Sequence, residues 1–200
     1  PIDYHIKGFE ALGATVKIAG DKYIIDAPEL NGADITFDFP SVGATINIML
    51  AAVKANGQTR IFNAAKEPEI VNIADFLKSM GAKIKGAGTD TITITGVKKL
   101  SKGNIYTIPD RIEAGTYIIA GALVGDHLVI DKIEPKHLES LLTTLKNMSV
   151  DYILEENSII ISKQTNFKPV NIASQVYPGF VTDLGQTMQT LLTQARGIST

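Results

Sequence analysis

Three stretches of the sequence place small or acidic residues just before an apolar run, as at a helix start that could bind an anion or accept a proton. They are residues 38–45, 110–116 and 182–184. In the first stretch, Ser41 can accept a hydrogen bond from an amide of the first helical turn, and the remaining amides and the helix dipole favour a negative ligand. Gly43 carries no side chain, so a ligand could approach the backbone closely. Each stretch taken alone fits a plain helix cap better than a binding site.

Other residues that could do chemistry also have simpler explanations. Asp183 is a candidate general base, but its position alone favours an N-cap. Glu67 and Glu69 flank Pro68, which is ordinary chemistry for a helix start, so we interpret this acidic pair as structural. The histidines share no metal-ligand spacing, and no metal site is predicted: His5, His127 and His137.

Composition narrows the class of protein. The chain has 200 residues, 44% of them hydrophobic, which is enough for a substantial core. A net charge of −2 gives no reason to expect nucleic acid or an anionic membrane as a partner, and the absence of cysteine excludes disulfides and thiolate catalysis in these residues. No apolar segment approaches the roughly 20 residues that span a bilayer. We expect a soluble, cytoplasmic protein. Because the sequence lacks an initial methionine and stops where a strand should begin, we also expect a fragment of a longer chain.

A repeat with a constant offset organises the chain. The segment around Gly13 resembles the segment around Gly81, and a weaker copy surrounds Ser149; the two offsets are equal, since 81 − 13 equals 149 − 81. In the second copy, apolar residues at helical spacing predict a helix over 69–80, and strict alternation predicts a strand over 91–95.

The other copies follow the same order of elements. The third predicts a helix over 135–148 and strands over 150–154 and 158–161. The first predicts strands over 15–18 and 23–26, and we expect it to have lost most of its helix.

A second kind of helix lies between each hairpin and the next copy. Residues 45–55 and 117–124 are apolar on nearly every side, and residues 184–195 more weakly so, which predicts helices buried all round. Short strands follow at 59–62 and 128–130. The resulting unit predicts an α/β (α+β) fold, an inside-out prism with sheets outside and helices inside, divided near residues 108–110. Two apolar stripes are assigned to the core: Tyr117, Ile118 and Ile119, and Leu141 with Leu142.

On these residues the chain resembles the enolpyruvyl transferases, and within them the branch that acts on UDP-N-acetylglucosamine. The blocks that carry the resemblance are residues 1–14, 41–45, 63–71, 88–90, 109–113 and 182–183. The resemblance implies two domains built from such repeats, with the active site in a cleft between them. Residues 1–108 would belong to the nucleotide-sugar domain and residues 109–200 to the second domain.

The resemblance also implies a reaction. The enolpyruvyl group of phosphoenolpyruvate is transferred to the 3′-hydroxyl of UDP-N-acetylglucosamine, phosphate is released, and no metal or organic cofactor is needed. This reaction is the first committed step of peptidoglycan synthesis.

Site residues follow from the matching blocks. Asp183 matches an aspartate that contacts the sugar hydroxyl and is favoured as general base, and a carboxylate within hydrogen-bond reach can take that proton. The segment that packs against the uridine is Pro1, Ile2, Asp3 and Tyr4, with Asp3 placed to bind the base edge. The loop that holds the diphosphate and uridine is Phe39, Pro40, Ser41 and Val42, with Gly43 beside it. Relatives often carry a basic residue where this chain has Phe39, so one charge contact to the diphosphate is expected to be missing. The resemblance places four further residues at the domain crossing or the cleft without a catalytic role: Asp110, Arg111, Glu67 and Glu69.

The chain also lacks parts that the resemblance calls for. These are a glycine-rich loop bearing a proton donor, a lysine near the N-terminus and further arginines, so this chain alone is expected to be inactive and to need the rest of the same polypeptide. Two alternatives stay open: the sister activity on shikimate 3-phosphate, and a non-catalytic repeat module that binds a sugar nucleotide or a protein partner.

Overall fold

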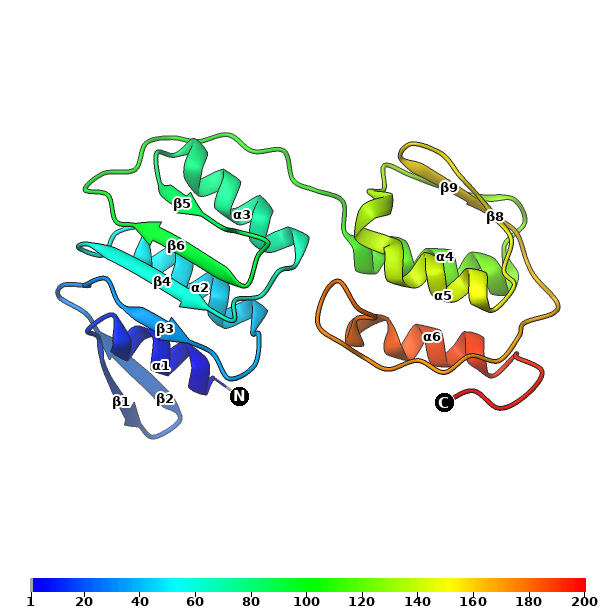
Figure 1. The fold of residues 1–200 in the computed structure, drawn as a ribbon, viewed down its shortest axis with the longest axis horizontal. Helices are drawn as coiled ribbons and strands as arrows, with labels where there is room; N and C mark the ends of the chain where they lie inside the picture. Colours follow the sequence, from blue (N-terminus) through cyan, green and yellow to red (C-terminus); the bar gives the residue numbers. More distant parts are fainter. Residues whose placement is uncertain (1) are drawn as a thin grey trace. The chain divides into compact units, whose positions relative to one another are not determined.

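The computed structural model describes residues 2–200, which form two compact units, Pro1–Thr107 and Ile108–Thr200, each described here by itself (Figure 1). Pro1, one of the predicted uridine contacts, lies outside the described residues.

The first unit combines three helices with a mixed sheet and a separate hairpin. Its elements are α1 (Asp3–Ala11), β1 (Thr15–Ala19), β2 (Lys22–Asp26), β3 (Asp34–Thr36), α2 (Val42–Ala52), β4 (Gln58–Phe62), α3 (Pro68–Ser79), β5 (Lys83–Lys85) and β6 (Thr91–Thr95). The sheet has the order β3-β4-β6-β5, in which β3 and β4 are parallel and the other pairs antiparallel. Because Ile92 and Ile94 point inward from β6, they join α2 and α3 in one core.

The second unit repeats this plan with a smaller sheet. Its elements are α4 (Arg111–Val124), β7 (Leu128–Asp131), a 3-10 turn (Pro135–Leu138), α5 (Glu139–Asn147), β8 (Tyr152–Leu154), β9 (Ser158–Ile161), a second 3-10 turn (Thr182–Leu184) and α6 (Gly185–Leu192). The sheet has the order β7-β9-β8 and is antiparallel. Ile118 and Leu141 bring α4 and α5 into its core.

The repeat is visible in the backbone. Gly13, Gly81 and Ser149 all have a left-handed conformation, with φ of 96°, 99° and 63°. The residue after each of them donates its amide to a carbonyl five positions back, at distances of 2.9, 3.0 and 2.9 Å. This is the bond that ends a helix in a Schellman motif. The constant spacing therefore repeats a helix end followed by a hairpin, which confirms the predicted mixed α/β repeat.

The first copy departs from the prediction, because it keeps its helix as α1. No side chain caps α1, so the sequence offers no start signal. Its support comes from α2: Gly8 is buried, and a Cβ at this position would lie 2.2 Å from Ile48 Cδ1. Only a residue without a side chain allows the two helices to approach so closely.

The two predominantly apolar helices are not buried all round, so that prediction was also wrong. Leu50 on α2 is exposed, and the Tyr117 side chain on α4, which was assigned to the core, is 55% exposed. Ile118, Ile119 and both leucines of the other predicted stripe are buried as expected. Within each unit these helices pack against the sheet and against other helices, α1 and α3 for α2 and α6 for α4, while Leu50 and Tyr117 stay exposed.

Candidate substrate-binding site

The start of α2 forms the predicted capped junction. Ser41 is extended, with φ of −118° and ψ of 116°, and its Oγ accepts a hydrogen bond from the amide of Ala44 at 3.3 Å. Within the part of the chain that the structure describes, the amides of Val42 and Gly43 have no acceptor. These two amides are therefore available to an anionic ligand, and the helix dipole favours one.

The predicted uridine segment lies beside this junction, although the two are far apart in sequence. The Tyr4 and Phe37 rings are 5.5 Å apart between centroids, and Lys7 Nζ lies 3.7 Å from Asp38 Oδ2. Asp3 is the first residue of α1 and is exposed. The packing of α1 against α2 thus brings Tyr4 and Lys7 beside Phe37 and Asp38, the residues that lead into the loop of Phe39, Pro40, Ser41 and Val42.

His5 is the residue of this region that sequence reasoning missed. Asn47 Nδ2 donates a hydrogen bond of 2.8 Å to His5 Nδ1. A Cβ at position 43 would lie 3.2 Å from His5 Cε1, so the space left free by Gly43 faces the imidazole and not open solvent alone. The sequence held no signal for this contact, because His5 and Gly43 are far apart along the chain and only the packing of α1 on α2 joins them.

Asp183 lies in the second unit, on the 3-10 turn that precedes α6. Position alone favoured an N-cap, and that interpretation was wrong, because no side chain caps this turn or α6. The Asp183 carboxylate is exposed and has no hydrogen-bond or ion-pair partner among residues 2–200. Its neighbour Leu184 is buried, and a Cβ at Gly115 would lie 2.9 Å from Leu184 Cδ2. The turn is therefore anchored on one side and presents an unpaired carboxylate on the other.

Asp110 occupies the corresponding place before α4 and behaves differently. Its Oδ1 accepts hydrogen bonds from the amides of Ile112 at 2.8 Å and Glu113 at 3.1 Å. The next residue, Arg111, places its guanidinium 5.4 Å from the centroid of the Tyr177 ring. Asp110 is thus an N-cap whose carboxylate is already engaged.

The acidic pair at the start of α3 is partly as predicted. Pro68 is in the first turn of the helix, as expected. Glu67, however, is buried, and its Oε2 has no hydrogen-bond partner among the described residues. A buried polar atom of this kind is normally satisfied, so Glu67 offers an acceptor to a group that the described residues do not supply.

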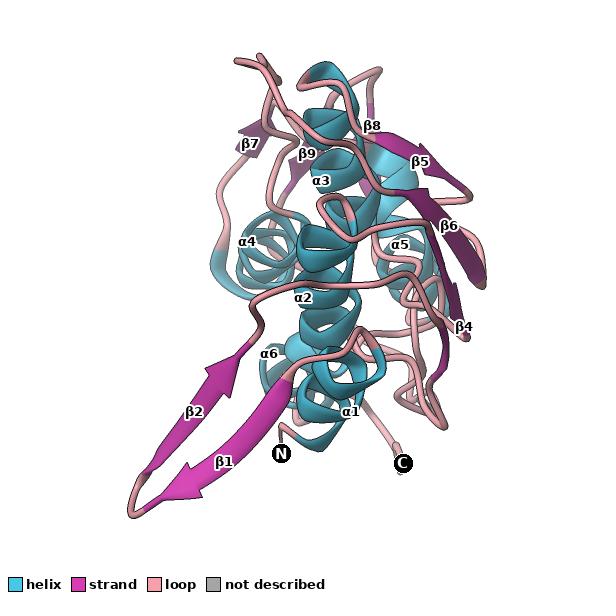
Figure 2. Ribbon diagram, turned by 90° about the vertical axis from the view of Figure 1, so that its left-hand side faces the viewer, coloured by secondary structure: helices cyan, strands magenta, loops and turns pink. Residues whose placement is uncertain are grey.

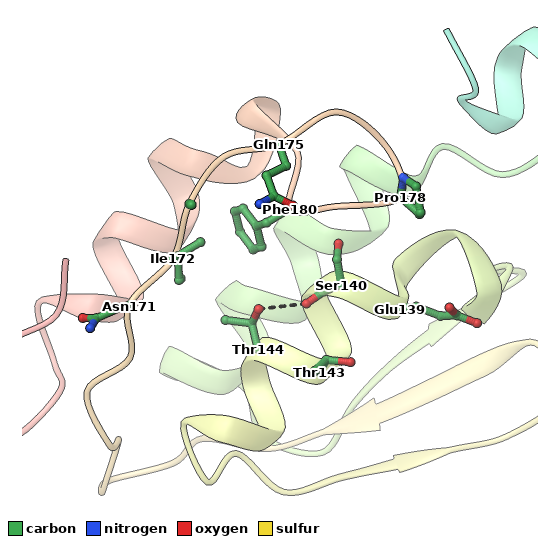
Figure 3. Close-up of a pocket in the computed structure, with 10 residues that line it drawn as sticks. Glu139, Ser140, Thr143, Thr144, Asn171, Ile172, Gln175, Pro178 and Phe180 are labelled. Atoms are coloured by element: carbon green, nitrogen blue, oxygen red, sulfur yellow. Dashed lines mark hydrogen bonds between the residues drawn. The ribbon is translucent and has the colours of Figure 1, made fainter. Parts of the chain in front are cut away.

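A hollow of about 440 Å³ in the second unit contains none of the predicted site residues (Figure 3). One wall is the polar face of α5, where Thr144 Oγ1 donates a hydrogen bond of 2.8 Å to the Ser140 carbonyl. Asn171, Gln175 and Phe180 line the other side. Its polar groups are hydroxyls and amides, and its one acid is Glu139.

The carboxylate of Asp34, on the sheet of the first unit, has a shifted pKa. Arg60 Nε donates a hydrogen bond of 2.8 Å to Asp34 Oδ1, and this bond lowers the pKa of Asp34.

Among the described residues, no three acidic or histidine side chains are grouped as a metal site. No helix within residues 2–200 has the length and apolar character that crossing a membrane requires.

Comparisons with known proteins match the whole chain. A family model described as EPSP synthase (3-phosphoshikimate 1-carboxyvinyltransferase) matches residues 1–200. UDP-N-acetylglucosamine 1-carboxyvinyltransferase of Clostridium botulinum is 55% identical over 199 residues, which are 100% of this chain and 48% of the relative. UDP-N-acetylglucosamine 1-carboxyvinyltransferase 2 of Bacillus subtilis is 55% identical over 200 residues, 100% of this chain and 47% of the relative. The chain spans about half the length of the curated relatives it matches.

Solved structures match in fold. The enolpyruvyl transferase NikO from Streptomyces tendae has a TM-score of 0.87 at 23% identity, over 98% of this chain and 50% of that chain. An EPSP synthase from Acinetobacter baumannii has a TM-score of 0.62 at 21% identity, over 86% of this chain and 42% of that chain.

Proposed function

Because the chain belongs to the EPSP synthase family, the enolpyruvyl transferases, we propose that it is part of a UDP-N-acetylglucosamine 1-carboxyvinyltransferase. The observation that carries this proposal is the identity of 52–55% over essentially the whole chain to relatives of that name. The fold agrees with the one expected from the resemblance.

The proposed reaction joins two substrates without a cofactor. The 3′-hydroxyl oxygen of UDP-N-acetylglucosamine forms a C–O bond to the enolpyruvyl group of phosphoenolpyruvate, and inorganic phosphate leaves. The hydroxyl proton needs an acceptor as this bond forms. With this activity we propose a role in peptidoglycan synthesis and a cytoplasmic location. The rest of the longer polypeptide would supply the other groups of the reaction, including a proton donor.

Asp183 is proposed as the base that accepts the hydroxyl proton or orients the hydroxyl. Two observations support this role. Its carboxylate is exposed and unpaired among residues 2–200, so both oxygens are free for a substrate hydroxyl. Leu184 anchors the turn in the core, and a fixed carboxylate is a better catalyst than a mobile one.

The nucleotide is proposed to bind at the starts of α1 and α2. The free amides of Val42 and Gly43 suit the diphosphate, because backbone amides at a helix start are natural ligands of phosphate oxygens. Asp3 carries an exposed acceptor for the N–H edge of uracil, and the exposed Phe39 offers an apolar surface. Ile2, Tyr4, Pro40 and Ser41 complete the segments that would pack against the uridine, as Pro1 would in the same proposal.

Calorimetry with UDP-N-acetylglucosamine tests the nucleotide site in the full-length protein. An Asp3→Ala change should weaken binding by about 10- to 100-fold, the effect of losing a hydrogen bond to a charged group. Glu10→Ala is the matched control, because Glu10 is an exposed acid on the same helix, outside the proposed nucleotide segments. Equal affinities for the two variants would refute the role of Asp3.

The second candidate is the activity on shikimate 3-phosphate, which the description of the matching family model favours. A phosphate-release assay on the full-length protein, with each acceptor in turn and phosphoenolpyruvate in both, separates the two. Release only with UDP-N-acetylglucosamine supports the proposal, and release only with shikimate 3-phosphate replaces it. Binding without release in either assay would favour the third hypothesis, a non-catalytic module.

A further inference from the structure

The segment that carries Asp183 contacts α4 at two points. Near Asp183 itself, Leu184 packs so closely on α4 that a Cβ at Gly115 would lie 2.9 Å from Leu184 Cδ2. Earlier in the segment, the centroid of the Tyr177 ring lies 5.4 Å from Cζ of Arg111. Arg111 and Gly115 are about one helical turn apart, so they lie on the same face of α4. Figure 2 shows α6, the helix that follows Asp183, next to α4.

The loop around Tyr177 is held in shape by its own backbone. The Gly179 amide donates a hydrogen bond of 2.9 Å to the Val176 carbonyl. The Gln175 amide donates one of 2.8 Å to the Phe180 carbonyl, and the Phe180 side chain is buried. Figure 3 shows the side chains of Gln175 and Phe180 close together on this loop. A displacement of the Tyr177 ring is therefore passed along the loop to the turn that follows Phe180.

A small cavity joins the two contacts with α4. Its volume is about 10 Å³, which leaves room for one water molecule at most. Its lining includes Arg111, Tyr177, Val181 and Leu184. Side chains packed around so little space do not move independently, because protein interiors are close-packed. Arg111 and Tyr177 therefore belong to the same packed group as Leu184, the residue that anchors the turn of Asp183.

The contact between Arg111 and Tyr177 suits a fixed position. Both side chains are partly buried. A cation over an aromatic ring is attracted to its face, and more strongly when water is excluded. The flat guanidinium of arginine can also stack on the ring, which the compact ammonium of lysine cannot do. The pair thus ties the start of α4 to the loop that leads to Asp183.

We propose that Arg111 is a positioning residue for Asp183. Its guanidinium holds the Tyr177 ring, the ring holds the loop, and the loop together with Leu184 sets where the Asp183 carboxylate lies. In this role Arg111 touches neither substrate. The inference rests on the proposed function, in which Asp183 accepts the proton of the sugar hydroxyl or orients this hydroxyl.

The test measures phosphate release by the full-length protein with UDP-N-acetylglucosamine and phosphoenolpyruvate. Arg111→Gln and Tyr177→Leu should each lower kcat by about 10-fold, because a small displacement of a catalytic group is costly. Since the lost positioning concerns the transition state, kcat/KM should fall by the same factor. The double variant should be no slower than either single variant, because all three lack the same contact. Tyr177→Phe keeps the ring and should keep kcat.

The Asp183→Asn background separates positioning from a purely structural role. In this background Arg111→Gln should have no further effect on kcat, because it acts only through the Asp183 carboxylate. A structural defect would lower kcat in both backgrounds. Lys146→Gln is the matched control, since Lys146 Nζ lies 5.8 Å from the centroid of the Tyr152 ring, in the same unit but outside α4 and the loop. It should leave kcat unchanged in either background.

An unchanged kcat for Tyr177→Leu, or an effect of Arg111→Gln that multiplies with that of Asp183→Asn, would overturn the inference. A fall in kcat for Asp183→Asn without one for Arg111→Gln would overturn it and leave the proposed function intact. If Asp183→Asn itself left kcat unchanged, the proposed role of Asp183 would fail first. Should Arg111→Gln not fold, Arg111→Lys keeps the charge without the flat guanidinium and should still lower kcat, by a smaller factor.

Discussion

The helix starts at Asp110 and Asp183 follow corresponding points of the repeat, yet they use their carboxylates in opposite ways. Asp110 accepts two amide hydrogen bonds and caps α4. Asp183 caps nothing, lies on a 3-10 turn and keeps its carboxylate exposed and unpaired among residues 2–200. A capping carboxylate stabilises the fold and is not free for a substrate, whereas an unpaired one adds nothing to stability and is free to act. The comparison therefore separates carboxylates that stabilise the fold from carboxylates that are free for chemistry.

The largest effect is expected for Asp183→Asn in the full-length protein. Asp183 is the proposed general base, and asparagine keeps its shape but cannot accept a proton. The substitution should therefore lower kcat by about 10²- to 10⁴-fold. The Tm should stay the same, since the side chain is exposed and has no partner among the described residues. Phosphate release and thermal unfolding measure the two quantities. A kcat equal to that of the unmodified protein would remove Asp183 from the mechanism.

Gly115→Ala should disturb the same carboxylate from a distance. The added Cβ would lie 2.9 Å from Leu184 Cδ2 and 3.1 Å from Leu141 Cδ2, and both leucines are buried, so a leucine side chain must move and we expect the turn that carries Asp183 to move with it. A displacement of about 1 Å can cost on the order of 100-fold in rate, so kcat should fall by about 10- to 100-fold.

A purely structural defect would lower the Tm and leave kcat per folded molecule unchanged. The control is Gly185→Ala, because the space around this glycine is open and α6 begins there. A drop in kcat for Gly185→Ala equal to that for Gly115→Ala would show that the contact with Leu184 does not position Asp183.

How far the sequence predicts these features depends on how local their causes are. The hairpins were predictable because Gly13 and Gly81 need a left-handed backbone and because Thr91–Thr95 alternates strictly. The cap at Ser41 was also predictable, since its hydrogen bond reaches only into the next helical turn.

Features that depend on long-range packing were not predictable. The helix α1 is supported by α2, through Gly8 against Ile48, which is distant in the sequence, and no local pattern indicates it. The contact of His5 with Asn47 has the same origin. Whether Asp183 caps a helix or points to solvent depends on how Leu184 packs against Gly115, which only the tertiary structure decides. The nucleotide and base roles came from the family resemblance, and they stay predictions.

Replacing the caps should affect stability alone. Asp110→Ala should lower the free energy of unfolding by about 1 kcal/mol, because it leaves two helix amides without their acceptor, and Ser41→Ala by a similar or smaller amount, because it leaves one. Chemical denaturation measures the loss for Asp110→Ala in the second unit and the loss for Ser41→Ala in the first unit. Asp183→Ala is the matched variant and should cost nothing measurable. If Asp183→Ala destabilised the protein as much as Asp110→Ala, the distinction between the two carboxylates would fail.

The smallest effect on stability is expected for Asp34, an exposed carboxylate that is hydrogen-bonded to Arg60. The hydrogen bond from Arg60 lowers the pKa of Asp34 below its ordinary value. A group with a lowered pKa in the folded state stabilises the protein above its unfolded pKa, and this contribution is lost as the pH falls through the folded pKa. The stability of the unmodified protein should therefore fall slightly more steeply in acid than that of Arg60→Gln. Because both side chains are exposed, added salt should erase the difference between the two proteins. Urea unfolding of both proteins below neutral pH, at low and high salt, measures it. A difference that persisted at high salt would mean that this pair is less screened than its exposure implies.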